Sequence, residues 1–590
     1  MGVAILDCGA QYAKVIDRRI RELGVESFLL PVDTPAETLK EYEAIILSGG
    51  PDSVNDDGSP RVDEAVFELG IPVLGVCYGM QLMAHHFQGK IGQKETKEYG
   101  ETIIAIKASP LFTGLEEREQ VLMSHGDSVL ELPEGFTAIA HSHDIIAAMA
   151  NDEKKMYGVQ FHPEVDLTLN GKQVYHNFLF GIANVEKSHN LELSVEKSVK
   201  KIRETVGTNN VAVLISGGVD SAVTAALLRK ALPKEQIYGI HIDHGFMRKD
   251  ESRTVMEALT ALDINVKLVE AAQEFQEATT TIDGKESCAL KDAVDPEVKR
   301  KIIGDCFITL SDRELKSIPG TVYLAQGTLR PDLIESASSL VSSTAETIKT
   351  HHNDSDLVRR KRAEGLVIET NKDWHKDEVR TIGKELGLPD YIVQRQPFPG
   401  PGLAIRCLCA DTADEIDPAP VQEIAKAYDL EADVLPIKSV GVQGDGRTYS
   451  YVSIVNGHDT WEQIKAAASE IPRKVHTVNR VCYSFGEPGP VQTSRLSKDR
   501  LDLLREADAI VREHLKEYPF AQVPVILLPN NSLVLRPFIT NDFMTGRAAI
   551  LGEELPWGVL RNIVKELAAL NITSVLYDLT SKPPGTTEWE

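Results

Sequence analysis

Short apolar runs alternate with amphipathic stretches through the first third of the chain. The runs are Val3–Leu6, Ala44–Leu47 and Ile71–Val76, and Tyr12–Leu23 between them has the spacing of a helix. Such alternation predicts a parallel sheet with helices on both faces. We therefore expect an α/β domain over residues 1–184, which ends before the polar segment 186–190.

A second series of the same kind begins at Val211. Its strand-like runs are Val211–Ile215, Ile237–Ile242 and Val266–Val269, with helical stretches between them. The cluster Pro397–Gly402 cannot continue a helix, so it marks a second boundary. The pattern predicts a second α/β domain over residues 185–396 and a further region over 397–590.

The last third contains a weak internal repeat. Residues 430–486 and 520–590 both show a strand, a second strand, a helix and a third strand in the same order. We interpret them as two copies of one small α+β unit, and chance similarity between two β-rich segments is the alternative.

The composition limits the possible partners. The chain has 63 Lys and Arg residues and 88 Asp and Glu residues, so its formal charge is -25. This charge disfavours binding to nucleic acid or to an anionic membrane. An anionic substrate therefore requires a local basic site. The seven cysteines form no C-x-x-C pair, which favours reduced thiols. No apolar stretch approaches the 18 residues that a membrane-spanning helix needs. The first residues lack a signal-peptide pattern, so we expect a cytoplasmic protein without a membrane partner.

The first candidate chemistry is a nucleophile at a strand-to-helix turn. Cys77 stands between a buried strand and the start of a helix, within Gly75-Val-Cys77-Tyr-Gly79. Glycines two residues to either side permit a tight turn, and the helix N-terminus favours a thiolate and offers N–H groups to an oxyanion. His162 and Glu164 end another apolar strand and complete a Cys-His-Glu triad. The alternative is a cysteine that only packs.

We call the strand-to-helix turn at Cys77 the nucleophile elbow. These residues resemble class I glutamine amidotransferases, which have the same elbow, a His-Pro-Glu element and a Ser-Gly-Gly-Pro loop that Ser48–Pro51 matches. The resemblance covers residues 3–184 and implies glutaminase chemistry at Cys77, with ammonia as the product. It further implies that Gly50 and Tyr78 supply oxyanion N–H groups. Gln81, Ser124 and His125 would line the glutamine pocket, although His125 also reads as an ordinary loop histidine.

The second candidate chemistry is a glycine-rich loop between a strand and a helix. Its residues are Ser216, Gly217, Gly218, Val219, Asp220, Ser221 and Ala222. Backbone N–H groups at a helix N-terminus cradle phosphates, and the absence of a Gly-Lys-Ser/Thr sequence argues against a Walker A loop. The alternative is a plain glycine turn.

This loop resembles that of the ATP pyrophosphatases, which have an adenine-nucleotide α-hydrolase-like fold and cleave ATP between its α- and β-phosphates. The resemblance implies ATP as co-substrate and Mg²⁺ near Asp220. Four further segments combine cations with polar groups: 241–248, 299–305, 326–332 and 349–353. His351 and His352 lack a third ligand at zinc-like spacing, so we prefer a polar active-site role for them.

The C-terminal sequence from Tyr577 to Glu590 resembles the terminal signature of the GMP synthetases, as do segments 396–406 and 441–447. The resemblance then spans the whole chain and implies a carbon-nitrogen ligase of purine biosynthesis with glutamine as amido donor. It implies that XMP is held by Arg300, Asp445, Gln522, Lys582 and Glu588.

The implied reaction has two steps. ATP adenylates XMP with release of pyrophosphate, and ammonia then displaces AMP to give GMP. Two alternatives stay open: a related enzyme with another acceptor, such as deamido-NAD or tRNA, and a non-catalytic sensor of nucleotide or glutamine.

The duplicated unit resembles the longer, eukaryotic-type members of the family. A unit that pairs across a subunit interface can pair within one chain when it is duplicated. We therefore expect a monomer or a weak homodimer promoted by substrates. Residues 411–433 are short for that type, which suggests a pared-down first copy.

Overall fold

The computed structural model describes residues 2–9, 12–330, 356–411, 414–443, 446–457, 461–540, 546–582 and 584–590. The chain forms two compact units, the first made of residues 1–196 and 329–349 and the second of 197–328 and 350–590. Within the described ranges, no helix has both the length and the apolar composition needed to cross a bilayer.

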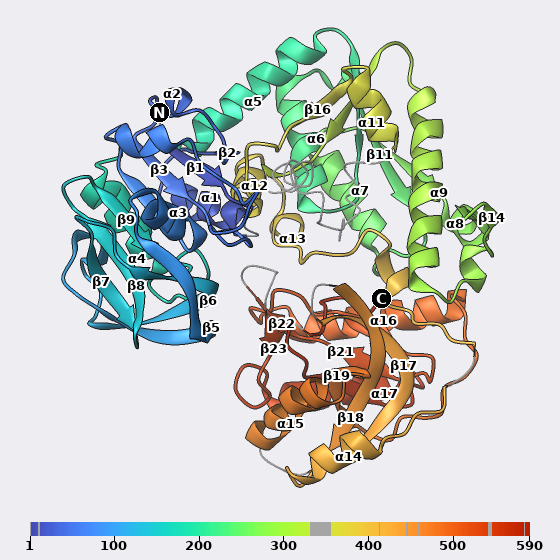
Figure 1. The fold of residues 1–590 in the computed structure, drawn as a ribbon. Helices are drawn as coiled ribbons and strands as arrows, with labels where there is room; N and C mark the ends of the chain where they lie inside the picture. Colours follow the sequence, from blue (N-terminus) through green and yellow to red (C-terminus); the bar gives the residue numbers. More distant parts are fainter. Residues whose placement is uncertain are drawn as a thin grey trace. The chain divides into compact units, whose positions relative to one another are not determined.

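A nine-stranded sheet forms the centre of the first unit (Figure 1), in the order β2-β1-β3-β4-β9-β8-β7-β5-β6. The strands from β2 to β9 in this order are parallel, as the apolar runs predict, and the others are antiparallel. The strands are β1 (Val3–Asp7), β2 (Ser27–Pro31), β3 (Ala44–Leu47), β4 (Val73–Val76), β5 (Lys90–Ile106), β6 (Arg118–Glu131), β7 (Thr137–Ser142), β8 (Ile145–Asn151) and β9 (Met156–Val159).

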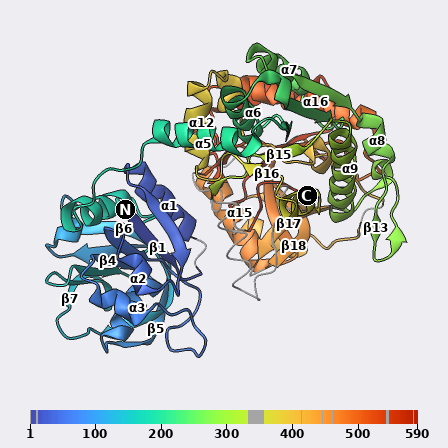
Figure 2. The same ribbon diagram turned by 90° about the horizontal axis from the view of Figure 1, so that it is seen from above.

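Helices cover both faces of this sheet because neighbouring strand residues point to opposite sides. Ile5 and Ile46 share a core with Ile16 of α1, whereas Leu6 and Leu47 share another with α2 and α3. Figure 2 shows α1 along the strands. The helices are α1 (Ala13–Glu22), α2 (Ala36–Leu39), η1 (Glu64–Glu68), α3 (Tyr78–His86), η2 (Pro110–Phe112), α4 (Gly171–His176) and η3 (Asn177–Ile182), and α5 (Leu191–Val206) contains the unit boundary.

The second unit contains a five-stranded parallel sheet in the order β12-β11-β10-β15-β16, again as predicted. Its strands are β10 (Asn210–Leu214), β11 (Ile237–Asp243), β12 (Val266–Glu270), β15 (Val322–Gln326) and β16 (Val367–Glu369). The surrounding elements are α6 (Val219–Ala231), η4 (Lys234–Gln236), α7 (Glu251–Ala261), α8 (Ala272–Glu277), β13 (Thr281–Ile282), β14 (Lys285–Glu286), η5 (Leu290–Asp292), α9 (Pro296–Lys316), α11 (Asp356–Ala363), α12 (Lys376–Glu385), α13 (Asp390–Val393) and η7 (Gly402–Ile405).

The same unit contains a six-stranded sheet in the order β17-β18-β19-β24-β21-β20. Its strands are β17 (Glu431–Gln443), β18 (Gly446–Asn456), β19 (Val478–Phe485), β20 (Val525–Leu527), β21 (Leu533–Leu535) and β24 (Val575–Asp578). The helices and the remaining hairpin are α14 (Ala419–Lys426), α15 (Trp461–Lys474), α16 (Lys498–Leu515), α17 (Trp557–Ala568), β22 (Phe538–Ile539) and β23 (Arg547–Ala548).

The two segments that look alike in sequence have the same topology. Each is an antiparallel hairpin, a helix and a third strand parallel to the second: β17-β18-α15-β19 and β20-β21-α17-β24. The copies meet where β19 runs antiparallel to β24, and Tyr483 there faces Tyr577.

Candidate functional site

Cys77 lies at the turn between β4 and α3, in a backbone conformation that only glycine adopts easily (φ 51°). Neighbouring chain segments crowd this turn. A Cβ on Gly75 would stand 2.5 Å from the carbonyl of Gly79, and one on Gly79 would stand 2.4 Å from the carbonyl oxygen of Leu47. Both glycines are therefore required for the turn that presents the thiol at the end of the strand.

The two predicted partners of Cys77 form a buried ion pair beside it. Nδ1 of His162 lies 2.7 Å from Oε1 of Glu164, and Tyr175 donates to Oε2 of Glu164 at 3.3 Å. Burial opposes charge on His162, but the charge of Glu164 and hydrogen bonds to Cys77 and Glu164 raise the pKa of His162 to about 10. The site thus favours the imidazolium form of His162 at neutral pH.

Other polar groups surround the sulfur. The Gln160 amide donates to Sγ of Cys77 at 3.6 Å, and the Ser124 carbonyl oxygen lies 3.9 Å from Sγ. Gln81 donates to the Asp127 carbonyl at 2.9 Å. His125 lies in β6 rather than in a loop, with Nδ1 3.0 Å from the same carbonyl. Gln160 was not among the predicted site residues, although it stands two positions before His162 on the same apolar strand end.

One predicted oxyanion donor, Gly50, lies in the loop after β3, and the other, Tyr78, is the first residue of α3. A Cβ on Gly50 would meet the Cys8 carbonyl oxygen at 2.7 Å, so this position excludes a side chain. The Tyr78 hydroxyl donates to the Pro60 carbonyl at 2.8 Å, which fixes the start of α3. Over the described ranges, neither backbone N–H has a hydrogen-bond acceptor, so both are available to a developing negative charge.

The second predicted site lies between β10 and α6. Gly217 has φ 81°, and the two serines close the loop on itself. Ser221 donates to the Gly218 carbonyl at 3.1 Å and accepts from the Ser216 N–H at 3.3 Å. A loop of this shape at the N-terminus of a helix presents N–H groups to phosphate.

The carboxylate of Asp220 pairs with a cation through one of its two oxygens. Lys376 at the start of α12 lies 2.5 Å from Oδ2, whereas Oδ1 is buried and, in the described part of the chain, has no hydrogen-bond partner. Asn371 donates to the Asp220 carbonyl at 3.0 Å. Lys376 and Asn371 were not predicted. Their position just after β16, at the same sheet edge as the loop, is the signal that identifies them.

Two further residues support this loop. Arg395 packs against Gly217, because a Cβ there would stand 2.7 Å from its guanidinium, and it pairs with Glu251. His241 binds the Ile215 carbonyl at 2.7 Å and Ser252 at 3.0 Å. Ile215 directly precedes the loop and Ser252 lies in α7, so both nitrogens of His241 are used in contacts within the protein.

The residues that are predicted to hold XMP fall into two groups in the structure. Arg300 donates to the main-chain oxygen of Glu590, and Glu588 forms a bidentate pair with Arg406 at 2.7 and 2.9 Å. Gln522 has a buried side-chain oxygen without a partner among the described residues, and it forms a β-bridge with Phe538.

Lys582 forms a β-bridge with Gly546, which packs directly against the Phe538 ring. Lys582 and Gln522 therefore belong to the second group, around β22 and β23. Asp445, His351 and His352 lie outside the described residues.

Comparison with known proteins gives two informative relatives. A glutamine-hydrolysing GMP synthase of Dictyostelium discoideum is 42% identical over 100% of this chain and 94% of its own length. A glutamine-hydrolysing GMP synthase of Bacillus subtilis is 44% identical over 83% of this chain and 97% of its own length. The chain belongs to the glutamine-hydrolysing GMP synthase family.

Family models match three parts of this GMP synthase family member. Residues 4–182 match class I glutamine amidotransferase, 191–321 match NAD synthase and 529–589 match the GMP synthase C-terminal domain. Cys77, His162 and Glu164 lie in the first match, the glycine-rich loop 216–222 lies in the second, and Lys582 and Glu588, which are predicted to hold XMP, lie in the third. The expected class I amidotransferase fold and ATP-pyrophosphatase-type fold are confirmed.

Proposed function

We propose that this protein is a glutamine-dependent GMP synthetase, in which one chain produces ammonia and consumes it. The observation that carries the proposal is the buried arrangement of Cys77, His162 and Glu164 in a chain that also holds the glycine-rich loop 216–222, where Asp220 pairs with Lys376 of α12. We assign residues 1–184 to the glutaminase, 185–396 to the ATP pyrophosphatase and 397–590 to acceptor binding.

In the glutaminase half, the Cys77 thiolate attacks the side-chain amide carbon of glutamine. The Gly50 and Tyr78 N–H groups hold the oxyanion, and His162 protonates the departing ammonia. Water activated by His162 then hydrolyses the thioester and releases glutamate. Glu164 keeps His162 oriented and charged, while Gln81, Ser124, His125 and Gln160 line the substrate side.

In the synthetase half, the C2 oxygen of XMP attacks the α-phosphorus of ATP and expels pyrophosphate. Ammonia then attacks C2, AMP leaves and the amine loses a proton. The N–H groups of residues 216–222 and the Lys376 ammonium stabilise the charge that moves onto the pyrophosphate.

Asp220 is suited to a Mg²⁺ ion because its buried Oδ1 is unpartnered in the described structure. No group of three or more His, Cys, Asp or Glu side chains forms a cage elsewhere within the described ranges. One carboxylate together with substrate phosphates and water is a typical Mg²⁺ environment. When bound, the ion would neutralise phosphate charge.

We assign XMP binding to Arg300, Asp445, Gln522, Lys582 and Glu588, where the cations meet the 5′-phosphate and the polar groups meet the purine. We also infer a monomer or a weak, substrate-promoted dimer, since the two copies pair through β19 and β24 within one chain. The seven free cysteines are consistent with a cytoplasmic location.

A purified-protein assay tests the proposal. With XMP, ATP, Mg²⁺ and glutamine, we expect GMP, AMP, pyrophosphate and glutamate in equal amounts. Deamido-NAD replaces XMP in a parallel reaction. Amidation of deamido-NAD in preference to XMP would contradict the assignment of the acceptor, and neither product would favour the non-catalytic sensor.

A further inference from the structure

The last residues of the chain pair with the edge of the six-stranded sheet. β17 is the outermost strand, and its N–H groups at Val440 and Val442 donate to Trp589 at 2.9 Å and to Pro584 at 2.7 Å. Gly441 forms an antiparallel bridge with Gly585. We call residues 584–590 the C-terminal tail. The tail comes from the second copy of the repeat, whereas β17 comes from the first.

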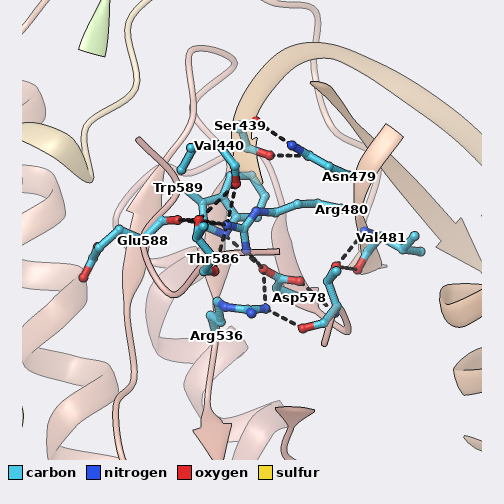
Figure 3. A network of polar contacts seen from close by, with 11 residues as sticks. Ser439, Val440, Asn479, Arg480, Val481, Arg536, Asp578, Thr586, Glu588 and Trp589 are labelled. Atoms are coloured by element: carbon cyan, nitrogen blue, oxygen red, sulfur yellow. Dashed lines mark hydrogen bonds and ion pairs between the residues drawn. The ribbon is translucent and has the colours of Figure 1, made fainter. Parts of the chain in front are cut away.

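A fully buried charge cluster lies beneath the tail (Figure 3). Arg480 of β19 and Arg536, which follows β21, both donate to Oδ2 of Asp578, at 2.9 and 2.8 Å. Trp589 of the tail donates to the same oxygen at 3.0 Å. Arg480 belongs to the first copy, and Arg536 and Asp578 belong to the second. The cluster therefore ties the two copies and the tail to one carboxylate.

The tail supplies most of the acceptors around Nη2 of Arg480, and the Val440 carbonyl of β17 supplies one more at 3.0 Å. Two guanidinium groups and one carboxylate leave one buried positive charge, which is costly unless further acceptors surround it. Nη2 of Arg480 donates to the carbonyls of Thr586 and Glu588, both at 2.8 Å, and to the Thr586 hydroxyl at 2.9 Å. The Arg480 guanidinium also stacks 4.9 Å from the centre of the Trp589 ring.

Burial of Arg480 and docking of the tail are thus mutually dependent. Burial lowers the pKa of Arg480 to about 10, and Asp578 opposes this shift. Glu588 is held at two points: its carbonyl binds Arg480, and its carboxylate binds Arg406. Glu588 is therefore fixed through both its backbone and its side chain.

A glycine allows the close approach of the tail to β17. A Cβ on Gly441 would stand 2.8 Å from the carbonyl oxygen of Pro584 and 2.7 Å from the Asn479 side chain. The Asn479 side chain is tied to Ser439 by hydrogen bonds of 2.8 and 2.7 Å. Any side chain at 441 would have to displace the tail backbone or this bonded pair.

We propose that Gly441, Arg480 and Thr586 are positioning residues that dock the C-terminal tail on the first copy, and that XMP binding requires this docking. The inference rests on the proposed function, because it takes Lys582 and Glu588 to contact XMP. The first copy of the repeat is then part of the XMP site, in addition to its role in the fold. Neither copy alone completes the site.

Two mild variants test the proposal in the full-length protein. Gly441→Ala places a methyl group against the Pro584 carbonyl, and Thr586→Val removes the hydroxyl that binds Arg480 and the Val440 carbonyl. The matched control is Gly558→Ala, since a Cβ at Gly558 in α17 meets no atom within 4 Å. Hydrogen exchange of the tail, XMP affinity by calorimetry and separate KM values for XMP and ATP are measured.

For Gly441→Ala we expect faster exchange in the tail and a rise of about tenfold or more in the XMP dissociation constant. Thr586→Val should raise this constant roughly threefold to tenfold, because it removes hydrogen bonds without a clash. The KM for ATP and the glutaminase rate should stay within about twofold of wild type, as in the control.

Tail exchange that is unchanged in both variants would overturn the docking arrangement. Faster tail exchange with unchanged XMP affinity would overturn the functional role of docking while leaving the proposed function intact. A wild-type protein that binds no XMP would overturn the proposed function and this inference together.

Discussion

Glu164→Gln removes the charge that faces His162 while keeping the shape of the side chain. Glu164 is buried, and its Oε1 lies 2.7 Å from Nδ1 of His162. In the native protein the pKa of His162 is about 10, against an ordinary value of 6.5. At about 1.4 kcal/mol for each pKa unit, the difference corresponds to roughly 5 kcal/mol in favour of the imidazolium.

The charge of Glu164 is the strongest influence that raises this pKa, and burial works against it. We therefore expect the variant to lose ~3–5 kcal/mol of ion-pair stabilisation, which corresponds to a fall of roughly two to four orders of magnitude in glutaminase kcat. The group has a raised pKa, so the charged form persists through neutral pH and is lost as pH rises through about 10. We call the fall of the glutaminase rate at high pH the alkaline limb of its pH profile. In the variant, this alkaline limb should move to about neutral pH.

The assay measures glutamate release between pH 5 and 11 together with ammonia-dependent GMP synthesis as a folding control. Tyr175→Phe is the matched comparison, because it removes only the hydroxyl that donates to Oε2 of Glu164 at 3.3 Å. We expect this variant to lose about tenfold or less. A Glu164→Gln protein with wild-type glutaminase activity and an unchanged alkaline limb would refute the triad.

Three further outcomes follow from the other sites. Asp220→Asn should reduce GMP synthesis by roughly a hundredfold or more from both glutamine and ammonia, and normal activity with unchanged Mg²⁺ dependence would contradict the assigned role. Lys582→Ala should raise the XMP dissociation constant about tenfold to hundredfold with little effect on ATP, and an unchanged constant would show that the terminal signature serves packing. Light scattering should give a monomer, or a weak dimer that XMP and ATP promote; a ligand-free dimer that persists on dilution would disprove pairing within the chain.

The sequence predicts the sheets well because their strands are continuous apolar runs, which local periodicity identifies. The elbow is equally predictable, since a nucleophile between two glycines at a strand end imposes its own geometry. The sequence leaves two interpretations of His125 open, an ordinary loop histidine and a residue that contacts glutamine. In the structure His125 belongs to β6, in which alternate residues from Val121 to Val129 are buried. The buried residues His125 and Asp127 are polar, so this part of β6 lacks the alternation of apolar and polar residues that identifies a strand.

Long-range pairings were not predictable in the same way. Lys376 pairs with Asp220 across 156 positions, and Arg480 pairs with Asp578 across 98. No local pattern links such residues, because the pairing depends on which strands become neighbours in the sheet. The tail shows the same limit: its sequence resembles a family signature, but its docking on β17 follows only from the strand order.

The central claim is that ammonia released at Cys77 becomes the amino group of GMP. Glutamine labelled with ¹⁵N in its side-chain amide, supplied with XMP, ATP and Mg²⁺ to wild-type protein, should give GMP with the label in its exocyclic amine. In Cys77→Ala the label from glutamine should disappear, while ¹⁵N-ammonium should still label GMP at a rate close to wild type. Equal loss from glutamine and ammonium, or labelled GMP from glutamine in the absence of the thiol, would contradict the account.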